Sequence, residues 1–402
     1  MKTIALIGTF DTKGEEYLYI KNKIENLGFH TLTIHVGVFE ATFTPDINHD
    51  SVALMADHMI EELQEAKDRG MAMDVLSRGL CEMIPKLFEE KLFDGVLALG
   101  GSGGTSLITP CMRMLPLGIP KIMVSTMAAG DVARYVGTSD ILMMPSIVDI
   151  AGINRISSQV FTHAVHAMIG MLEHENTDLK VKKPLVVATM YGVTTPCVMK
   201  AKEYLEEQGY EVIIFHASGT GGRMMESLIH SGIVDGVLDL TTTEWIDEIC
   251  GGIMAAGPDR LNAASLNGIP QVVSVGAADL ITFGSRETLP KEFEGRLVYM
   301  HNPAITVVRS NIEENITFGI KVGEKLNQCI SPAILLLPTQ GISMNDKEGS
   351  KYYGPEEDRA LFLSLKEVIS NPLVEIMEVD VHINDPSFAL LAAKKLISLM
   401  EK

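Results

Sequence analysis

The chain has 402 residues, and its 52 Asp and Glu outnumber its 33 Lys and Arg, which gives a formal net charge of −19. This length is typical of two domains, and the composition, 46% apolar and 21% charged, is that of a globular protein rather than a disordered one. Nucleic acids and anionic membranes bind clusters of Lys and Arg, so the negative charge disfavours both as partners.

Signals for export or membrane insertion are not visible in the sequence. The first apolar run turns polar at Thr9, which is too early for a signal peptide, and no apolar stretch is long enough to span a bilayer. The five cysteines are odd in number and widely scattered, which is unlike a disulfide framework. We therefore predict a cytoplasmic protein with reduced thiols.

Strands and helices alternate from the first residues onward. Apolar runs predict strands at 3–8, 31–36 and 94–99, and a helix that ends at Gly28 lies between the first two. A broken helical stretch is expected over 71–91. Further strands are predicted at 121–126, 141–144, 185–189, 211–215, 297–301, 333–337 and 374–381. This alternation predicts an α/β protein with doubly wound, mostly parallel sheets, which bind ligands at the carboxyl ends of their strands.

The order of these features repeats near the middle of the chain. Residues 93–99 (FDGVLAL) are echoed by residues 234–240 (VDGVLDL), and Gly118-Ile119-Pro120 is echoed by Gly268-Ile269-Pro270. The repeat predicts two related Rossmann-like domains, residues 1–180 and 181–402.

A glycine-rich loop between a strand and a helix is the main candidate binding site. It consists of Gly100, Gly101, Ser102, Gly103, Gly104, Thr105 and Ser106, and the helix is expected to begin near Thr105. Glycines allow close approach of a phosphate, and N–H groups at a helix start bind its oxygens. The loop lacks the Lys of a Walker A motif, and no acidic residue ends the next strand as in nicotinamide-binding folds. A simple tight turn is the alternative without a ligand.

The same residues also fit the G-x-S-x-G pattern of a serine nucleophile. In that alternative Ser102 attacks, an acid from Asp131, Asp140 or Asp149 follows, and His163 or His166 is the base. Both histidines fall inside a predicted helix, whereas the base of such a triad normally lies on a late loop. The hydrolase is therefore the less favoured interpretation.

The loop after the first predicted strand places a cation beside the start of a helix. Thr12 and Glu15 have the spacing of a capping box, which predicts that the helix begins there, and Lys13 follows directly. An ammonium opposes the helix dipole at that position, so its placement makes better sense beside a bound anion.

Other loops at predicted strand ends carry hydroxyls, carboxylates or glycines. Thr126, Thr138 and Asp140 are candidates in the first domain, where a carboxylate could bind Mg²⁺ through water or a ribose. Gly219, Gly221, Gly222 and Arg223 form a second glycine-rich loop that includes a cation. Neither His163/His166 nor the segment 382–385 has zinc-site spacing, so we predict no metal bound by protein ligands alone.

Five segments in order resemble a known family. They are Gly8-Thr9-Phe10-Asp11-Thr12-Lys13, residues 99–106, residues 137–140, residues 215–223 and residues 256–261. They are similar to the Tm-1-like ATP-binding domain family, which includes the N-terminal inhibitory domain of the tomato mosaic virus resistance protein. The resemblance covers nearly the whole chain. It implies two Rossmann-like domains, bound ATP with Mg²⁺, a homodimer, and Thr9 and Asp11 beside Thr12 and Lys13 in the site.

Together these observations predict a cytosolic ATP-binding protein that acts on a small metabolite in a cleft between the two domains. Its reaction would be of ligase, kinase or hydrolase type, and the catalytic residues and second substrate are not identified. Lys13 and the glycine-rich loop would surround the phosphates. A nucleotide-binding or inhibitory module without catalysis is the alternative from another class, and the Ser102 hydrolase is the third.

Overall fold

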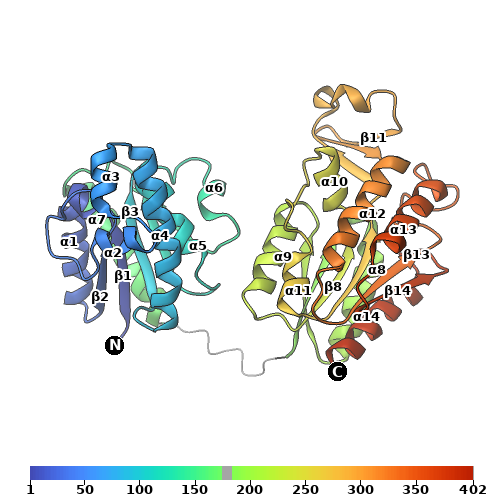
Figure 1. The fold of residues 1–402 in the computed structure, drawn as a ribbon, viewed down its shortest axis with the longest axis horizontal. Helices are drawn as coiled ribbons and strands as arrows, with labels where there is room; N and C mark the ends of the chain where they lie inside the picture. Colours follow the sequence, from blue (N-terminus) through green and yellow to red (C-terminus); the bar gives the residue numbers. More distant parts are fainter. Residues whose placement is uncertain (174–182, 402) are drawn as a thin grey trace. The chain divides into compact units, whose positions relative to one another are not determined.

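The computed structural model describes residues 1–173 and 183–401 and forms two compact units, Met1–Lys180 and Val181–Lys402 (Figure 1). The sequence placed its domain boundary at the same position. Both units are α/β and each has a parallel main sheet, as predicted. No helix within the described residues combines the length and the hydropathy needed to cross a bilayer.

The first unit has a five-stranded sheet in the order β2-β1-β3-β4-β5, and every pair is parallel. The strands are β1 (Thr3–Gly8), β2 (His30–His35), β3 (Gly95–Gly100), β4 (Lys121–Ser125) and β5 (Leu142–Pro145). The chain moves outward from β1 to β2 and then returns to add β3 on the other side. The strand order therefore reverses between β1 and β3, the type of position where open α/β sheets bind ligands.

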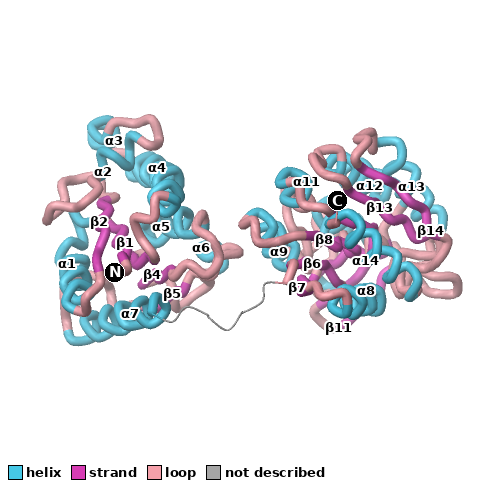
Figure 2. The backbone as a smooth tube through the Cα atoms, turned by 90° about the horizontal axis from the view of Figure 1, so that it is seen from below, coloured by secondary structure: helices cyan, strands magenta, loops and turns pink. Residues whose placement is uncertain are grey.

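Helices cover both faces of this sheet (Figure 2). Alternate residues of β1 point to opposite faces: Ile4 and Leu6 pack with α1 (Phe10–Asn26) and α7 (Arg155–Glu173). Ala5 and Ile7 pack on the other side, with α4 (Arg69–Glu89) and α5 (Ser102–Arg113). Shorter helices are α2 (His49–Leu54), α3 (Ile60–Ala66) and α6 (Ala133–Val136). The expected break within 71–91 is wrong, because α4 is one helix that includes Pro85.

The second unit has six parallel strands in the order β14-β13-β9-β8-β6-β7. They are β6 (Leu185–Met190), β7 (Glu211–His216), β8 (Gly236–Thr241), β9 (Gln271–Gly276), β13 (Ala333–Pro338) and β14 (Val374–Val379). Counted along the chain within this sheet, the first five strands have the same 2-1-3-4-5 order as the first unit. The shared order supports the internal duplication that the sequence predicted.

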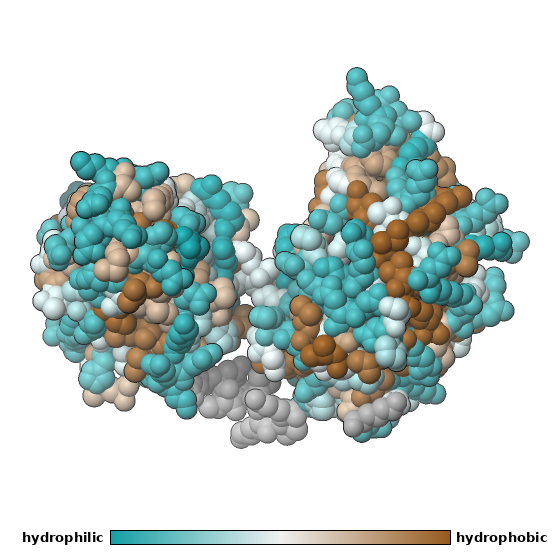
Figure 3. All heavy atoms as spheres, in the orientation of Figure 1, coloured by the Kyte–Doolittle hydropathy of each residue, from teal (hydrophilic) through white to brown (hydrophobic). Residues whose placement is uncertain are grey.

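Two layers of helices enclose the second sheet as well. One face carries α8 (Thr195–Glu207) and α14 (Pro386–Met400). The other carries α9 (Thr220–His230), α10 (Glu244–Cys250), α11 (Asn262–Asn267), α12 (Ile312–Leu326) and α13 (Pro355–Val368). Figure 3 shows hydrophobic residues on the face of this unit that carries α12 and α13, where Ile312, Ile316 and Ile320 are each more than a third exposed.

A small antiparallel sheet interrupts the parallel pattern between β9 and β13. Its strands are β10 (Leu280–Phe283), β11 (Val298–Asn302) and β12 (Ile305–Arg309), in the order β10-β12-β11. Of these, the sequence predicted only the strand at 297–301. The other two are runs of four or five residues, a length at which hydrophobic pattern alone does not separate strand from loop.

Buried charges hold the base of this antiparallel sheet. Asp279, directly before β10, and Arg309, the last residue of β12, are both buried. Arg309 Nη2 donates to Asp358 Oδ1 at 3.1 Å and lies 3.7 Å from Asp346 Oδ1, and Ser343 Oγ donates to Asp279 Oδ2 at 2.8 Å. Burial raises the pKa of Asp279 to about 7 and that of Asp358 to about 9, although the nearby guanidinium opposes both shifts.

This cluster predicts a pH dependence of stability. Between pH of about 4 and about 7 the native chain keeps a proton on Asp279 that the unfolded chain releases, so stability falls as pH rises. Asp279→Asn removes that titration. We expect urea unfolding midpoints of Asp279→Asn to fall less steeply over this pH range than those of the wild type. The exposed Asp259→Asn is the control, and an unchanged slope in Asp279→Asn would contradict the prediction.

Candidate functional site

The loops after β1 and β3 meet in one pocket. Thr9 to Lys13 follow β1 and Gly101 to Gly104 follow β3, so both leave the sheet where the strand order reverses. Residues of both loops line a cavity of about 630 Å³. That volume is within the range of roughly 300–1,000 Å³ typical of small-molecule sites. The two segments that the sequence singled out in the first domain are therefore neighbours.

The glycine-rich loop presents an uncapped helix start to this pocket. β3 ends at Gly100, Gly101 is the N-cap without a side-chain bond, and α5 begins at Ser102, three residues before the predicted Thr105. No acceptor among the described residues contacts the N–H groups of Ser102, Gly103 or Gly104. First-turn N–H groups need a partner or water, and they carry the positive end of the helix dipole.

Two of the predicted hydroxyls do not face the pocket. Thr105 is fully buried, and its Oγ1 donates to the carbonyl of Gly101 at 2.8 Å and contacts Ser125 Oγ at 2.6 Å. Ser106 is exposed outside the lining, which leaves Ser102 as the lining hydroxyl of this loop. Thr105 therefore holds the turn in place and is not free to contact a ligand.

The first turn of α1 differs from the predicted capping box. The helix begins at Phe10, and the Thr12 hydroxyl donates to Thr9 Oγ1 at 2.9 Å instead of capping a helix that starts after it. Lys13 interrupts the helical backbone with φ of −131° and ψ of 25°, and its Nζ donates to the Ile150 carbonyl at 2.6 Å. Thr9, Thr12 and Lys13 all line the pocket.

Residues after β2 form a wall that several side chains fix in place. The backbone N–H of Phe39 donates to Asp11 Oδ2 at 3.2 Å. The carbonyls of Gly37, Val38 and Phe39 are contacted by side chains of His49, Gln64 and His35, at 2.7, 2.8 and 2.8 Å. Burial lowers the pKa of His35, which favours its neutral form, and its Nδ1 accepts the N–H of Phe10 at 3.0 Å. This wall is therefore preorganised.

Two cations of the pocket were missed in the sequence. Lys67 follows α3 directly and Arg69 is the first residue of α4, and both line the cavity. A Cβ placed on Gly103 would lie 3.0 Å from Arg69 Nη2, so the guanidinium lies over the glycine-rich loop. An exposed basic residue at a helix start has no local sequence signature, and only the packing of α4 beside α5 brings Arg69 to the loop.

The structure separates the other first-domain candidates from the pocket. Thr126 follows β4, and its N–H donates to the Gly100 carbonyl at 3.3 Å, behind the loop. Thr138 and Asp140 precede β5, and Asp140 lies at the amino end of the strands, not the carboxyl end. There it pairs with buried Lys121 at 2.6 Å and accepts the N–H of Gly118 at 2.8 Å. None of the three lines the pocket.

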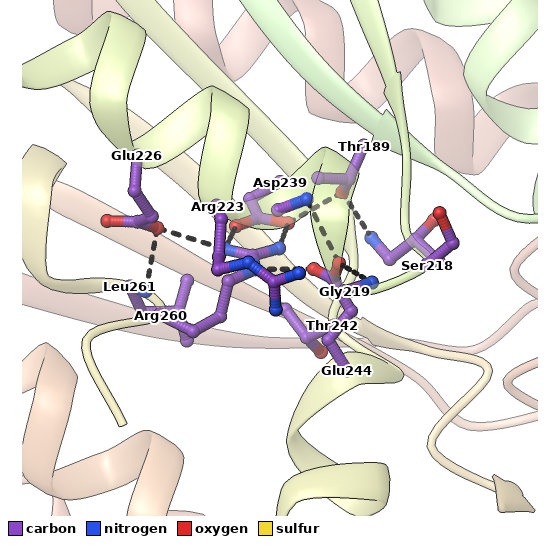
Figure 4. Close-up of polar contacts among 12 residues, drawn as sticks. Thr189, Ser218, Gly219, Arg223, Glu226, Asp239, Thr242, Glu244, Arg260 and Leu261 are labelled. Atoms are coloured by element: carbon purple, nitrogen blue, oxygen red, sulfur yellow. Dashed lines mark hydrogen bonds and ion pairs between the residues drawn. The ribbon is translucent and has the colours of Figure 1, made fainter. Parts of the chain in front are cut away.

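The second glycine-rich loop surrounds an anion that belongs to the protein itself (Figure 4). The N–H groups of Gly219 and Gly222, at the start of α9, donate to Glu244 Oε1 at 2.6 and 3.0 Å. A Cβ on Gly221 would overlap the His216 carbonyl, which explains that glycine structurally. Arg223 donates to the carbonyl of Ala255 at 3.0 Å. The loop therefore has the predicted anion-binding geometry, with a fully buried Glu244 as the anion.

Arg260 neutralises part of this buried charge. Its Nε donates to Glu244 Oε2 at 2.7 Å, its Nη2 donates to Asp239 Oδ1 at 2.8 Å, and its Nη1 lies 3.3 Å from Glu226 Oε1. Burial raises the pKa of Glu226, while Arg260 opposes that shift. Glu244 follows β8, the topological counterpart of β3, so it occupies in the second unit the position that the open loop has in the first.

Residues 1–173 and 183–401 do not assemble a serine triad. Ser102 is the first residue of α5, and no histidine is among the described residues that line its pocket. His163 and His166 are exposed on α7, which covers the opposite face of the sheet from α5. Asp131 accepts the N–H of Ala133 at 2.9 Å.

The fold and the site define a two-domain α/β protein with an uncapped helix start at the strand-order reversal of its first domain. Residues 2–177 and 183–400 match the N-terminal and C-terminal domains of the uncharacterised protein family UPF0261. The chain belongs to this family.

Relatives confirm the resemblance seen in the sequence. A UPF0261 protein of Clostridium tetani is 51% identical over 100% of both chains, and one of Rhizobium meliloti is 41% identical over 97% of both. The ToMV resistance protein Tm-1 of Solanum lycopersicum is 36% identical over 98% of this chain and 55% of its own length.

Likeness to solved structures is weak. A UDP-N-acetylglucosamine 2-epimerase from Rickettsia bellii has a TM-score of 0.22 at 11% identity, covering 68% of this chain and 78% of its own. A thioesterase domain from the curacin pathway has a TM-score of 0.27 at 12% identity, covering 55% and 92%. Scores this low carry no conclusion about function.

The buried Glu244 predicts a large loss of stability on truncation. Glu244→Ala leaves two N–H groups without an acceptor and removes a partner of buried Arg260, so we expect a loss of about 3 to 5 kcal/mol. Glu203→Ala, in the exposed pair with Lys200, is the control and should cost far less, because water screens exposed ion pairs. Chemical unfolding measures both. Equal, small effects would show that Glu244 is not the structural anion of this loop.

Proposed function

We propose that the chain binds ATP, together with Mg²⁺, in the pocket of its first unit. The observation that carries the proposal is the uncapped start of α5 facing cationic side chains across a cavity. Three N–H groups and the side chains of Lys13, Lys67 and Arg69 converge on one space in a chain of net charge −19. Phosphate groups satisfy helix N–H donors and cations at the same time.

Three cations of the pocket outnumber its two carboxylates, Asp11 and Asp68, and both carboxylates are engaged with backbone N–H groups. Asp68 Oδ1 accepts the N–H groups of Gly70 and Met71, at 2.8 and 3.1 Å, as the cap of α4. Asp11 accepts the N–H of Phe39. Mg²⁺ is usually bound by phosphate oxygens, waters and one or two carboxylates, so in this proposal the phosphates and waters supply most of its ligands.

The rest of the pocket suits a flat, largely apolar group such as a nucleotide base. Its lining includes the side chains of Val38, Phe39, Leu63, Met73 and Leu107. A nicotinamide dinucleotide fits less well, because β2 ends in His35 and supplies no acidic residue for a ribose. Asp11 reaches that place from the first loop, but its Oδ1 is enclosed and its Oδ2 is already bonded.

The reaction that would use the nucleotide belongs to the same proposal. An ATP-dependent reaction on a small metabolite, as a ligase, kinase or hydrolase, is the form that the sequence favoured. The lining favours a second candidate, a nucleotide-binding module without catalysis. Among the described lining residues there is no histidine, and both carboxylates already accept backbone N–H groups. The proposed homodimer and the proposed second substrate do not come from the pocket. They rest on the family resemblance and on the internal duplication of the chain.

Calorimetric titration tests the binding proposal directly. We expect wild-type protein to bind ATP with Mg²⁺ and to bind NADH at least tenfold more weakly. Gly103→Val should weaken ATP binding at least tenfold, because its side chain would occupy the space between the glycine-rich loop and Arg69 that the phosphates are proposed to fill. Gly170→Val on α7, where a Cβ meets open space, is the control. Tight NADH binding without a response to ATP would refute the proposal.

A second experiment separates this proposal from the hydrolase. In an ATP site Ser102 contacts phosphate and has no activating base, so it should not react with a fluorophosphonate probe. Peptide mass spectrometry after exposure reads the outcome. Stoichiometric labelling at Ser102, absent in Ser102→Ala, would establish a serine nucleophile instead.

A further inference from the structure

We propose that Arg69, supported by Lys67, makes the pocket sensitive to the number of phosphates on its nucleotide. This inference rests on the proposed function and adds a specificity-determining residue to it. Arg69 would contact the phosphates beyond the one held at the start of α5. The nucleotide preferred by the site would then be a triphosphate over a diphosphate, and a diphosphate over a monophosphate.

Hydrogen bonds fix the backbone between α3 and α4, whereas the side chains of Lys67 and Arg69 have no partner among the described residues. Asp68 caps α4 through Gly70 and Met71, which sets where α4 begins. Lys67 adopts a left-handed backbone with φ of 50°, which turns the chain sharply between α3 and α4. No hydrogen bond or ion pair from Lys67 or Arg69 to another described residue is present. The turn therefore directs two unpaired cations at the cavity.

The position of Arg69 is unfavourable for the helix that carries it. It is the first residue of α4, where a cation opposes the helix dipole. It is also exposed and forms no ion pair with an acidic side chain of the described residues. Arg69 thus lowers the stability of its own helix and lies over Gly103. Binding of an anion from outside the protein would explain both features.

The two sides of the pocket differ in how firmly their cations are held. Lys13 is anchored by its bond to the Ile150 carbonyl, and the N–H groups of α5 are fixed by the helix. These rigid donors suit the first phosphate, whatever the length of the ligand. Arg69 and Lys67 are exposed without a partner among the described residues, and they would gain contacts only when further phosphates extend toward α4. An added charge-assisted contact of this kind changes affinity by roughly ten- to a hundredfold.

Titration of nucleotides with one, two and three phosphates tests this inference. AMP, ADP and ATP are titrated by calorimetry, at constant Mg²⁺, into full-length wild type, Arg69→Ala and Arg78→Ala. Arg78 lies on the same helix, is exposed, pairs with Asp74 at 2.9 Å and does not line the pocket, so it is a matched control. We expect Arg69→Ala to lose at least tenfold in ATP affinity while its AMP affinity stays within about twofold. Arg78→Ala should bind AMP, ADP and ATP with the same affinities as the wild type.

Two further measurements keep the result interpretable. Arg69→Lys retains the charge but not the paired N–H groups, and it should give an ATP affinity between those of the wild type and Arg69→Ala. Thermal unfolding without ligand should show Arg69→Ala to be no less stable than the wild type, because a cation leaves the first turn of α4.

The possible failures are distinct. If the wild type binds AMP, ADP and ATP equally, or if Arg69→Ala weakens all three equally, this inference is wrong and the nucleotide site stands. If the folded wild type binds none of the three, the proposed function itself is wrong.

Discussion

The N–H groups in the first turn of a helix need acceptors, and the two units of this chain meet that need differently. In the second unit Glu244 reaches the start of α9 and bonds Gly219 and Gly222, so the turn is satisfied within the protein. In the first unit nothing among the described residues reaches the start of α5. That open helix end is the feature on which the proposed ligand site rests.

The internal duplication allows the two units to be compared position by position. Both sheets share the 2-1-3-4-5 strand order, so the position after β3 corresponds to the position after β8. The first unit has glycines there, and the second has a buried carboxylate matched by Arg260. In the second unit this carboxylate is the acceptor for the helix start that follows strand β7, whereas the glycines of the first unit leave their own helix start uncapped.

The sequence predicted the parts of this arrangement that are local. Short apolar runs followed by glycines identified β1, β3 and the loop after each, because a buried strand and a helix start leave marks in consecutive residues. The helix start at Ser102 and the bonds of Thr105 depended on how the turn packs, so they were missed. Asp140 was placed beside the site because it stands near a strand, but it precedes β5 and therefore lies at the other edge. Arg69 and Lys67 could not be found locally, since α4 reaches the loop only through tertiary packing.

The bond from Lys13 to Ile150 links the pocket to a distant part of the chain. One turn further along α1, the buried Glu16 accepts the N–H of Gly152 at 2.6 Å. Helix α1 therefore forms two hydrogen bonds with the segment before α7. The Lys13 ammonium has three N–H donors, so it can contact an anion in the pocket and still donate to the Ile150 carbonyl. The lining of the pocket and the segment that leads into α7 are thus joined through the first two turns of one helix.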